Sequence, residues 1–172
     1  ALIKNLNKID SDLIFIKNID NVQRKELAKD NAYYKQVLAG KLIQVQVELF
    51  KWLKEIDAGN YSKNKADIDE FINESLQVKG EIKDEQTAKQ MLNRPIRVCG
   101  MVKNEGAPGG GPFWVKLDNG LTTLQIVETS QMDLDDKQQK DILENSTHFN
   151  PVDIVCGVKD YQGKKFDLEK YV

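Results

Sequence analysis

Asn93-Arg94-Pro95-Ile96-Arg97-Val98-Cys99-Gly100-Met101-Val102 is the stretch at which the chain changes from a helical to a β pattern. All four prolines and eight of the eleven glycines lie beyond Asn93. Proline and glycine mark turns between strands, whereas helix interiors tend to exclude them. The sequence therefore predicts an α/β protein that is mainly helical before Pro95 and mainly β after it.

The segment from about 23 to 93 carries the helical periodicity. A long helix is predicted from about Gln23 to Ala58, ended by Gly59-Asn60, with shorter helices over Ala66–Val78 and Glu85–Leu92. Apolar residues recur along the long helix at spacings of three and four, as is typical of a side facing the core. They are Leu38, Leu42, Val45, Leu49, Leu53 and Ile56. We expect this segment to be a helical insertion between two β-rich parts.

Apolar runs and turn signals predict the strands. Leu13–Ile16 reads as a strand buried on both faces, because its apolar run is continuous. Asp118-Asn119-Gly120 is a strong turn signal, so the strands on either side of it should form a hairpin. The remaining predictions are the hairpin strands Phe113–Leu117 and Thr122–Val127, buried strands over Ile96–Val102 and Val152–Val158, a helix from Asp133-Leu134-Asp135-Asp136 to Asn145, and a turn at Gln162-Gly163.

Charge and apolar content exclude some kinds of partner. The 25 Lys and Arg residues against 27 Asp and Glu give a net charge of -2, so we expect neither a nucleic acid nor a membrane as partner. No apolar run approaches the roughly 20 residues that span a bilayer, and no signal peptide opens the chain. We expect a cytoplasmic protein. It begins with Ala1, inside a stretch with helical apolar spacing, so we expect a fragment whose upstream part is missing.

Cysteine and histidine content restricts the chemistry further. Cys99 and Cys156 are isolated and the sequence has no CxxC, so a structural zinc site would lack ligands. We expect both to be small core residues in neighbouring strands, where they could also meet as a disulfide. His148 is the single histidine, which excludes a HExxH metalloprotease, and no GxSxG elbow is present.

The first candidate for chemistry is Lys17-Asn18-Ile19-Asp20-Asn21, directly after the first strand. In open α/β sheets, ligands bind beyond the carboxyl ends of strands. A carboxylate between two amides suits Mg²⁺, which binds one or two carboxylates together with substrate phosphates. The alternative is that Asp20 and Asn21 only cap the helix that follows.

The second candidate is the loop from Lys103 to Trp114, which contains Gly109, Gly110 and Gly111. Consecutive glycines let the backbone approach a ligand and turn its N–H groups toward oxygen atoms. Lys103 could add positive charge for a phosphate, although the spacing is not that of a P-loop. A flexible hairpin loop is the alternative.

Two further polar residues end predicted elements. Glu128 follows Leu124-Gln125-Ile126-Val127 and could accept hydrogen bonds from sugar hydroxyls, or could be a solvated strand end. Asn150, before Pro151, could also bind a sugar or could terminate a turn.

The order of these motifs resembles the UDP-sugar pyrophosphorylases over about Asp12 to Val155. In that family a strand ends in a Ser/Asn-Asp-Asn element, matched by Ile19-Asp20-Asn21, and a Lys-to-Gly-Gly loop follows, matched by Val102-Lys103 and the glycine loop. A V/L-E-x-S/A-E/Q element comes next, matched by Val127 to Gln131, and then a Phe-Asn element, matched by Phe149-Asn150. Over its whole length, the chain looks more closely like an uncharacterised Bacteroidetes family catalogued as domain of unknown function 4301. The stretch from Arg94 to Gly106 and its PGGGPFWV continuation are the specific mark of that family.

The pyrophosphorylase resemblance implies a GT-A-like (nucleotide-diphospho-sugar transferase) mixed sheet and Mg²⁺-dependent transfer of a nucleotidyl group. The partners of the intact protein would be an NTP and a sugar 1-phosphate. By position, Asp20 would bind the metal, and Asn18 or Asn21 would lie near the sugar phosphate. Lys103 would be the catalytic residue that helps with phosphate charge. The residues facing sugar hydroxyls would be Gly109, Gly110, Gly111, Glu128 and Asn150.

The chain departs from that family in ways that limit the expected activity. The glycine-rich nucleotide-binding loop is absent, and Pro151 stands where a second Asn is expected. We therefore expect residues 1–172 to be the C-terminal, sugar-side portion of a nucleotidyltransferase-like domain, interrupted by the helical insertion at about 23–93 and inactive without its N-terminal half. The alternative is a non-catalytic scaffold or interaction module on the same fold.

Overall fold

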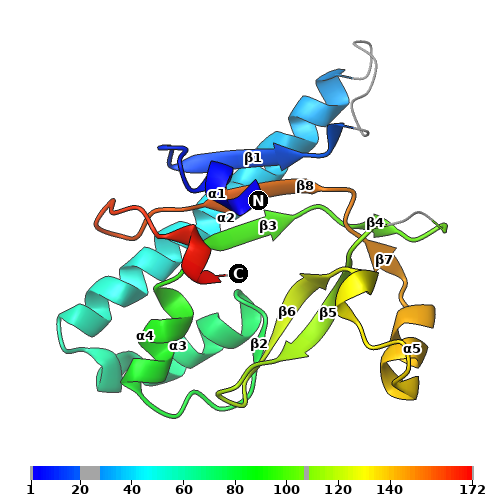
Figure 1. Cartoon of the computed structure of the whole chain (residues 1–172). Helices are drawn as coiled ribbons and strands as arrows, with labels where there is room; N and C mark the ends of the chain where they lie inside the picture. The colour runs from blue at the N-terminus through cyan, green and yellow to red at the C-terminus, as the bar shows by residue number, and fades with distance from the viewer. Residues whose placement is uncertain (1, 20–27, 107–108, 172) are drawn as a thin grey trace.

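The computed structural model describes residues 2–19, 28–106 and 109–171 (Figure 1). Over these ranges the protein is mixed α/β, as predicted, with strands arranged as β1-β8-β3, β2-β6-β5 and β4-β7. Every strand pairing within these three sheets is antiparallel. Because antiparallel neighbours end at opposite edges, the carboxyl ends of adjacent strands do not meet at one edge of these sheets, and the GT-A-like mixed sheet stays a prediction.

The first sheet has β8 (Asp153–Gly157) at its centre, between β1 (Leu13–Lys17) and β3 (Ile96–Cys99). The long helix α2 packs against β8 and β3, and its N-terminal end extends past the edge strand β1 (Figure 1). Strand β1 lies at the edge, where the Phe15 side chain is 48% exposed. The prediction that this strand is buried on both faces is wrong, because an edge position leaves one face only partly covered.

The second sheet contains the predicted hairpin, formed by β5 (Gly111–Lys116) and β6 (Thr122–Val127). Lys116 pairs with Thr122, and Gly120 in the turn has a φ of 85°, which glycine adopts without strain. The short strand β2 (Val78–Lys79) pairs with the other edge of β6. The hairpin prediction is confirmed.

The third sheet consists of β4 (Val102–Lys103) and β7 (His148–Phe149). The prediction of one strand over Ile96–Val102 is wrong, because the chain leaves β3 at Gly100-Met101 and enters another sheet as β4. The Gly100 N–H still donates to the Asp153 carbonyl at 2.8 Å, so the break starts directly after the β3–β8 ladder.

The helices follow the predicted segments with shifted ends. Helix α2 spans Ala28–Asp57, α3 Tyr61–Glu74, α4 Glu85–Leu92 and α5 Lys137–Glu144. The short elements are α1 (Leu2–Leu6) and the 3-10 helices η3 (Thr129–Gln131) and η4 (Leu168–Tyr171). The helix predicted to reach Val78 ends at Glu74, because Gln77 has a φ of 53° and turns the chain into β2. Helix α5 begins later than expected because Asp136, not Asp133, accepts the Gln138 N–H as N-cap.

The main hydrophobic core lies between α2, α3, α4 and the second sheet. The predicted apolar stripe of α2 is confirmed as core at Leu42, Val45, Leu49, Leu53 and Ile56, which are buried, whereas Leu38 at its start is only half-buried. Ile68 and Ile72 of α3 and Leu92 of α4 pack against them, together with Val78 of β2. A smaller core around Ile14, Cys156, Val158 and Leu168 lies on another side of the first sheet. In the described ranges, no helix combines the length and apolar character needed to cross a bilayer.

Candidate functional site

Several of the predicted site residues meet where the second and third sheets adjoin. Lys103 of β4 pairs with His148 of β7, and Asn150 follows that strand. The Asn150 N–H donates to the Gly110 carbonyl at 2.8 Å. The Glu128 carboxylate lies beside Gly110 on the neighbouring strand. We call this region, formed by Lys103, Gly109 to Gly111, Glu128 and Asn150, the glycine corner.

The glycines of this corner permit close packing of the backbone. A Cβ on Gly110 would lie 2.6 Å from Ile126 Cγ2 and 3.0 Å from Glu128 Oε1. A Cβ on Gly111 would lie 2.7 Å from a ring carbon of Phe113. Gly110 and Gly111 are buried, whereas Gly109 is exposed. Gly110 and Gly111 therefore allow the loop to pack closely on its neighbours, whereas the backbone of Gly109 faces solvent.

Two side chains of the corner are accessible. Glu128 is exposed after the end of β6, where its N–H donates to Gln131 Oε1 at 2.9 Å. Lys103 is exposed on β4. The corner thus has one exposed carboxylate, which can accept hydrogen bonds, and one exposed ammonium, which can donate them.

The Asn150 side chain is buried and makes hydrogen bonds within the fold. Its side chain is only 3% exposed, and its Nδ2 donates to the Gly100 carbonyl at 2.6 Å. Its Oδ1 accepts the Val152 N–H at 3.0 Å, and Val152 has a φ of 58°. The amide therefore joins the break between β3 and β4 to the turn that precedes β8.

An ion pair that the sequence did not suggest lies beside this connection. Lys17 Nζ of β1 is 3.0 Å from Asp153 Oδ2 of β8, and the two side chains are 18% and 25% exposed. The second oxygen, Asp153 Oδ1, is buried without a hydrogen-bond partner among the described residues. The two residues are far apart in sequence and only the β1–β8 register brings them together, so no local pattern could have identified them.

Asn18 directly follows Lys17 and is half-buried. Asp20 and Asn21 lie outside the described residues, so the structure does not test their predicted roles. Among the described residues, no group of three or more His, Cys, Asp or Glu side chains is placed to hold a metal ion. The predicted Mg²⁺ site therefore rests on the resemblance for Asp20.

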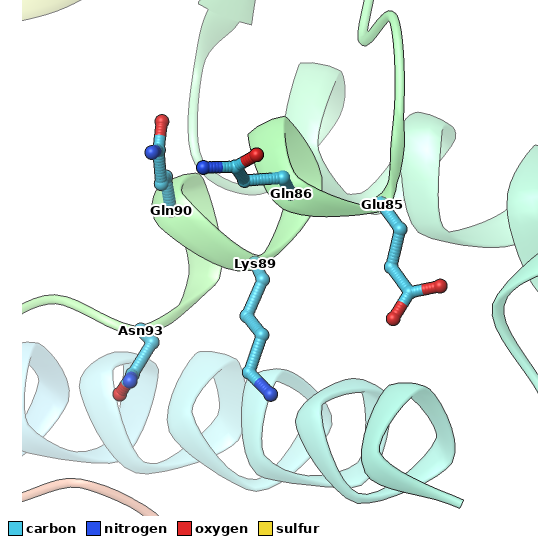
Figure 2. A pocket seen from close by; sticks show the side chains of 5 residues that line it. All are labelled: Glu85, Gln86, Lys89, Gln90 and Asn93. Carbon is cyan, nitrogen blue, oxygen red and sulfur yellow. The ribbon is translucent and has the colours of Figure 1, made fainter. Parts of the chain in front are cut away.

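Helix α4 borders an open depression of about 560 Å³ that the sequence did not suggest. Figure 2 shows Lys89 and Asn93 pointing toward α2, while Gln90 points away from it. Lys89 pairs with Asp57, whose carboxylate also accepts the Tyr161 hydroxyl. The hydrogen bond from Lys89, followed by that from Tyr161, lowers the pKa of Asp57. This network joins α2, α4 and the segment after β8, so we assign it a stabilising role.

The two cysteines lie in adjacent strands, as predicted, and both are free thiols. Burial raises the pKa of the Cys156 thiol to about 11 and also raises the pKa of Cys99. The nucleophilic thiolate is therefore scarce at neutral pH. Cys156 is a core residue, as predicted, whereas Cys99 is only half-buried.

The protein is mixed α/β with antiparallel sheets, and the glycine corner lies where two of these sheets adjoin. The chain belongs to the family described as Domain of unknown function (DUF4301), whose sequence model matches residues 1–172. No curated protein and no solved structure matches it. The predicted family membership is confirmed, whereas the similarity to UDP-sugar pyrophosphorylases stays a prediction.

Proposed function

We propose that the chain is the sugar-side part of a protein that transfers a nucleotidyl group from an NTP to a sugar 1-phosphate. The observation that carries the proposal is the glycine corner. Glu128, directly after β6, lies beside Gly110, and Lys103 lies on β4, whose partner strand β7 contacts β5 at the same sheet junction. Their backbone N–H groups, carboxylate and ammonium are groups that can bind the hydroxyl and phosphate oxygens of such a substrate.

Within this proposal the accessible side chains have distinct roles. The Glu128 carboxylate accepts hydrogen bonds from sugar hydroxyls, and the Lys103 ammonium offsets phosphate charge. Asn150 acts through its backbone N–H, which holds Gly110 in place, because its amide already binds Gly100 and Val152. Transfer at phosphorus depends mainly on positioning and charge neutralisation, so a protein nucleophile is not required.

Asp20 would hold the metal in this proposal, with Asn18 or Asn21 near the sugar phosphate. Mg²⁺, when bound, would supply positive charge at the phosphate oxygens. In this proposal another part of the protein supplies the nucleotide side of the site. Among the described residues the outer edge of β1 has no strand partner and Phe15 is half-exposed, and an edge strand of this kind can accept another strand. We place the activity in the cytoplasm, as the composition predicts.

The test is Mg²⁺-dependent pyrophosphate exchange by the intact protein with a panel of NTPs and sugar 1-phosphates. Asp20→Asn should abolish exchange, and Glu128→Gln should raise the KM for the sugar 1-phosphate about tenfold, as expected for one lost charged hydrogen bond. Lys140→Met, on the exposed side of α5, is the matched control and should change neither constant.

Three results would change the proposal. No exchange with any pair, in protein shown to be folded, would replace it with the non-catalytic scaffold or interaction module. Exchange that survives Asp20→Asn would keep the activity and overturn the metal site. Exchange unaffected by Glu128→Gln would move the sugar away from the glycine corner.

A further inference from the structure

Helix α2 carries a second stripe of side chains, on the side opposite the core. Its residues follow one another at spacings of three and four, which is the heptad spacing of a helix that pairs with another helix. All of them are exposed. We call this stripe the α2 seam, formed by Asp30, Tyr33, Val37, Gly40, Gln44, Val47, Lys51 and Lys54.

The middle of the α2 seam is uncharged and largely apolar. Tyr33, Val37 and Val47 are 63%, 50% and 66% exposed, and Ile43 beside them is 47% exposed. The solvent side of a helix ordinarily carries polar and charged residues. The N-terminal end of α2 also extends past the edge strand β1, so the first sheet does not cover it (Figure 1). The core of the chain therefore does not account for these apolar side chains.

Gly40 lies at the centre of the α2 seam, inside a regular helix. A Cβ at this position would meet nothing within 4 Å, so no contact in the described chain requires glycine. Alanine is the better residue for an exposed helix interior, because glycine loses more conformational freedom on folding. A glycine is useful here if the backbone of another element comes close to α2.

An antiparallel pair of α2 helices, related by a two-fold axis, would fill the middle of the α2 seam. In the heptad layers of such a pair, Val37 of one copy faces Val47 of the second copy. Gly40 of one copy faces Gln44 of the second, so the larger side chain lies where glycine leaves room. Each contact occurs twice because of the symmetry, as in an isologous interface. The seam is thus complementary to itself in size and in apolar character.

The ends of the α2 seam are complementary in charge in the same antiparallel arrangement. Asp30 faces Lys54 of the second copy, and neither has an ion pair with another described residue. Tyr33 faces Lys51, whose aliphatic stem can lie along the ring. The Lys51 ammonium can keep its contact with Trp52 of its own helix, 3.9 Å from the ring centroid. A parallel pair would place Lys51 against Lys51 and Lys54 against Lys54, which is unfavourable.

We propose that two copies of this chain associate through antiparallel pairing of their α2 helices along the α2 seam. The seam from Asp30 to Lys54 is about 36 Å long at 1.5 Å per residue, and a helix is about 10 Å wide, so each copy buries roughly 400 Å². This area is below that of permanent dimers, so the association is reversible, with a dissociation constant above about 10 µM. The inference does not rest on the proposed function, because no residue of the glycine corner takes part.

Sedimentation velocity of the 172-residue chain at about 5 to 500 µM tests the association. The weight-average sedimentation coefficient should rise with concentration toward that of a dimer. Val47→Lys places a charge opposite Val37 of the second copy and should weaken the association at least about tenfold. Ile142→Lys, at a 55% exposed apolar position of α5, is the matched control and should leave the association unchanged.

Gly40→Ala separates the interface from the stability of the helix. It should raise the urea midpoint of the monomer, measured at a concentration well below the dissociation constant, because alanine is the better helix former. The same change should weaken the association several-fold, because the added methyl group meets Gln44 of the second copy. A higher urea midpoint with unchanged association would overturn the close approach at Gly40.

Cysteine variants test the direction and register of the pairing. A mixture of Val37→Cys and Val47→Cys chains should form a disulfide-linked dimer under mild oxidation, whereas each variant alone should not. The parent chain, which contains Cys99 and Cys156, is the control. Crosslinking of each variant with itself would overturn the antiparallel pairing. A chain that stays monomeric at its highest soluble concentration, or a Val47→Lys chain that associates as the parent does, would overturn the proposal in favour of a different occupant of the α2 seam.

Discussion

Replacing Asn150 with alanine tests whether this residue is a bridge in the fold. The amide donates to the Gly100 carbonyl at 2.6 Å and accepts the Val152 N–H at 3.0 Å, and the side chain is 3% exposed. Alanine would leave both backbone groups without these partners. A buried polar group left unsatisfied costs about 1–3 kcal/mol, so the free energy of unfolding should fall by roughly 2–5 kcal/mol.

The strain at Val152 strengthens this expectation. Its φ of 58° is rare for a β-branched residue, and the hydrogen bond from its N–H to Asn150 Oδ1 helps to hold that conformation. Asn150→Asp keeps the acceptor for Val152 but replaces the donor to Gly100 with an oxygen. It should therefore destabilise the protein too, and more at neutral than at acidic pH, where the new carboxyl is protonated.

Urea unfolding followed by circular dichroism measures these differences, provided that the slope of free energy against urea is unchanged. Asn145→Ala is the matched control, because Asn145 is exposed and donates to one local carbonyl, that of Asp141, at 2.8 Å. It should cost less than about 1 kcal/mol. An Asn150→Ala protein within about 0.5 kcal/mol of the parent would refute the bridging role and leave the amide available to a ligand.

Three other predictions follow from the core, an ion pair and the thiols. Leu53→Ala, at a fully buried position of α2, should lower the free energy of unfolding by about 2–5 kcal/mol in the same urea assay. Because hydrogen bonding to Lys89 lowers the folded pKa of Asp57, its stabilising effect is complete above the ordinary value near 3.9 and is lost as pH falls through the lowered folded pKa. Asp57→Asn should remove that part of the acid dependence in unfolding curves collected at decreasing pH, and an unchanged acid limb would contradict the assignment. Cys156 should react with a thiol reagent slowly at neutral pH and faster as pH approaches about 11, and rapid labelling at neutral pH would show that the thiol is not buried.

Elements whose signal is local could be predicted from the sequence. The spacing of Leu42, Leu49 and Leu53 requires only helical geometry to place these side chains on one side of α2, and all three are buried. The turn at Asp118-Asn119-Gly120 determines the hairpin register through a few neighbouring residues. In both cases the residues that decide the structure lie within a few positions of those they affect.

Features that depend on distant pairing could not be predicted in this way. The continuous apolar run of β1 does not reveal that the strand lies at a sheet edge, which depends on what pairs with β8. Val78 reads as the end of a helix, yet pairing with Thr123 makes it part of β2. The sequence indicates the residues of the glycine corner only as separate motifs, because their arrangement in space depends on the β4–β7 and β5–β6 pairings.

The way the chain passes between sheets explains why the glycine corner is tied to the first sheet. Strand β3 leaves the first sheet at Gly100 and continues as β4, while β7 leaves the third sheet near Asn150 and continues as β8. The β3–β4 and β7–β8 connections thus both run between the first and third sheets. The hydrogen bond from Asn150 Nδ2 to the Gly100 carbonyl joins these two connections. The Asn150 N–H also holds Gly110, so one residue connects the loop of the corner to the strand that pairs with β1. In the part of the chain that the structure describes, β1, β8, Asn150 and Gly110 are thus joined by an unbroken series of hydrogen bonds and chain connections, so a shift of β8 would be transmitted to the glycine corner through Asn150.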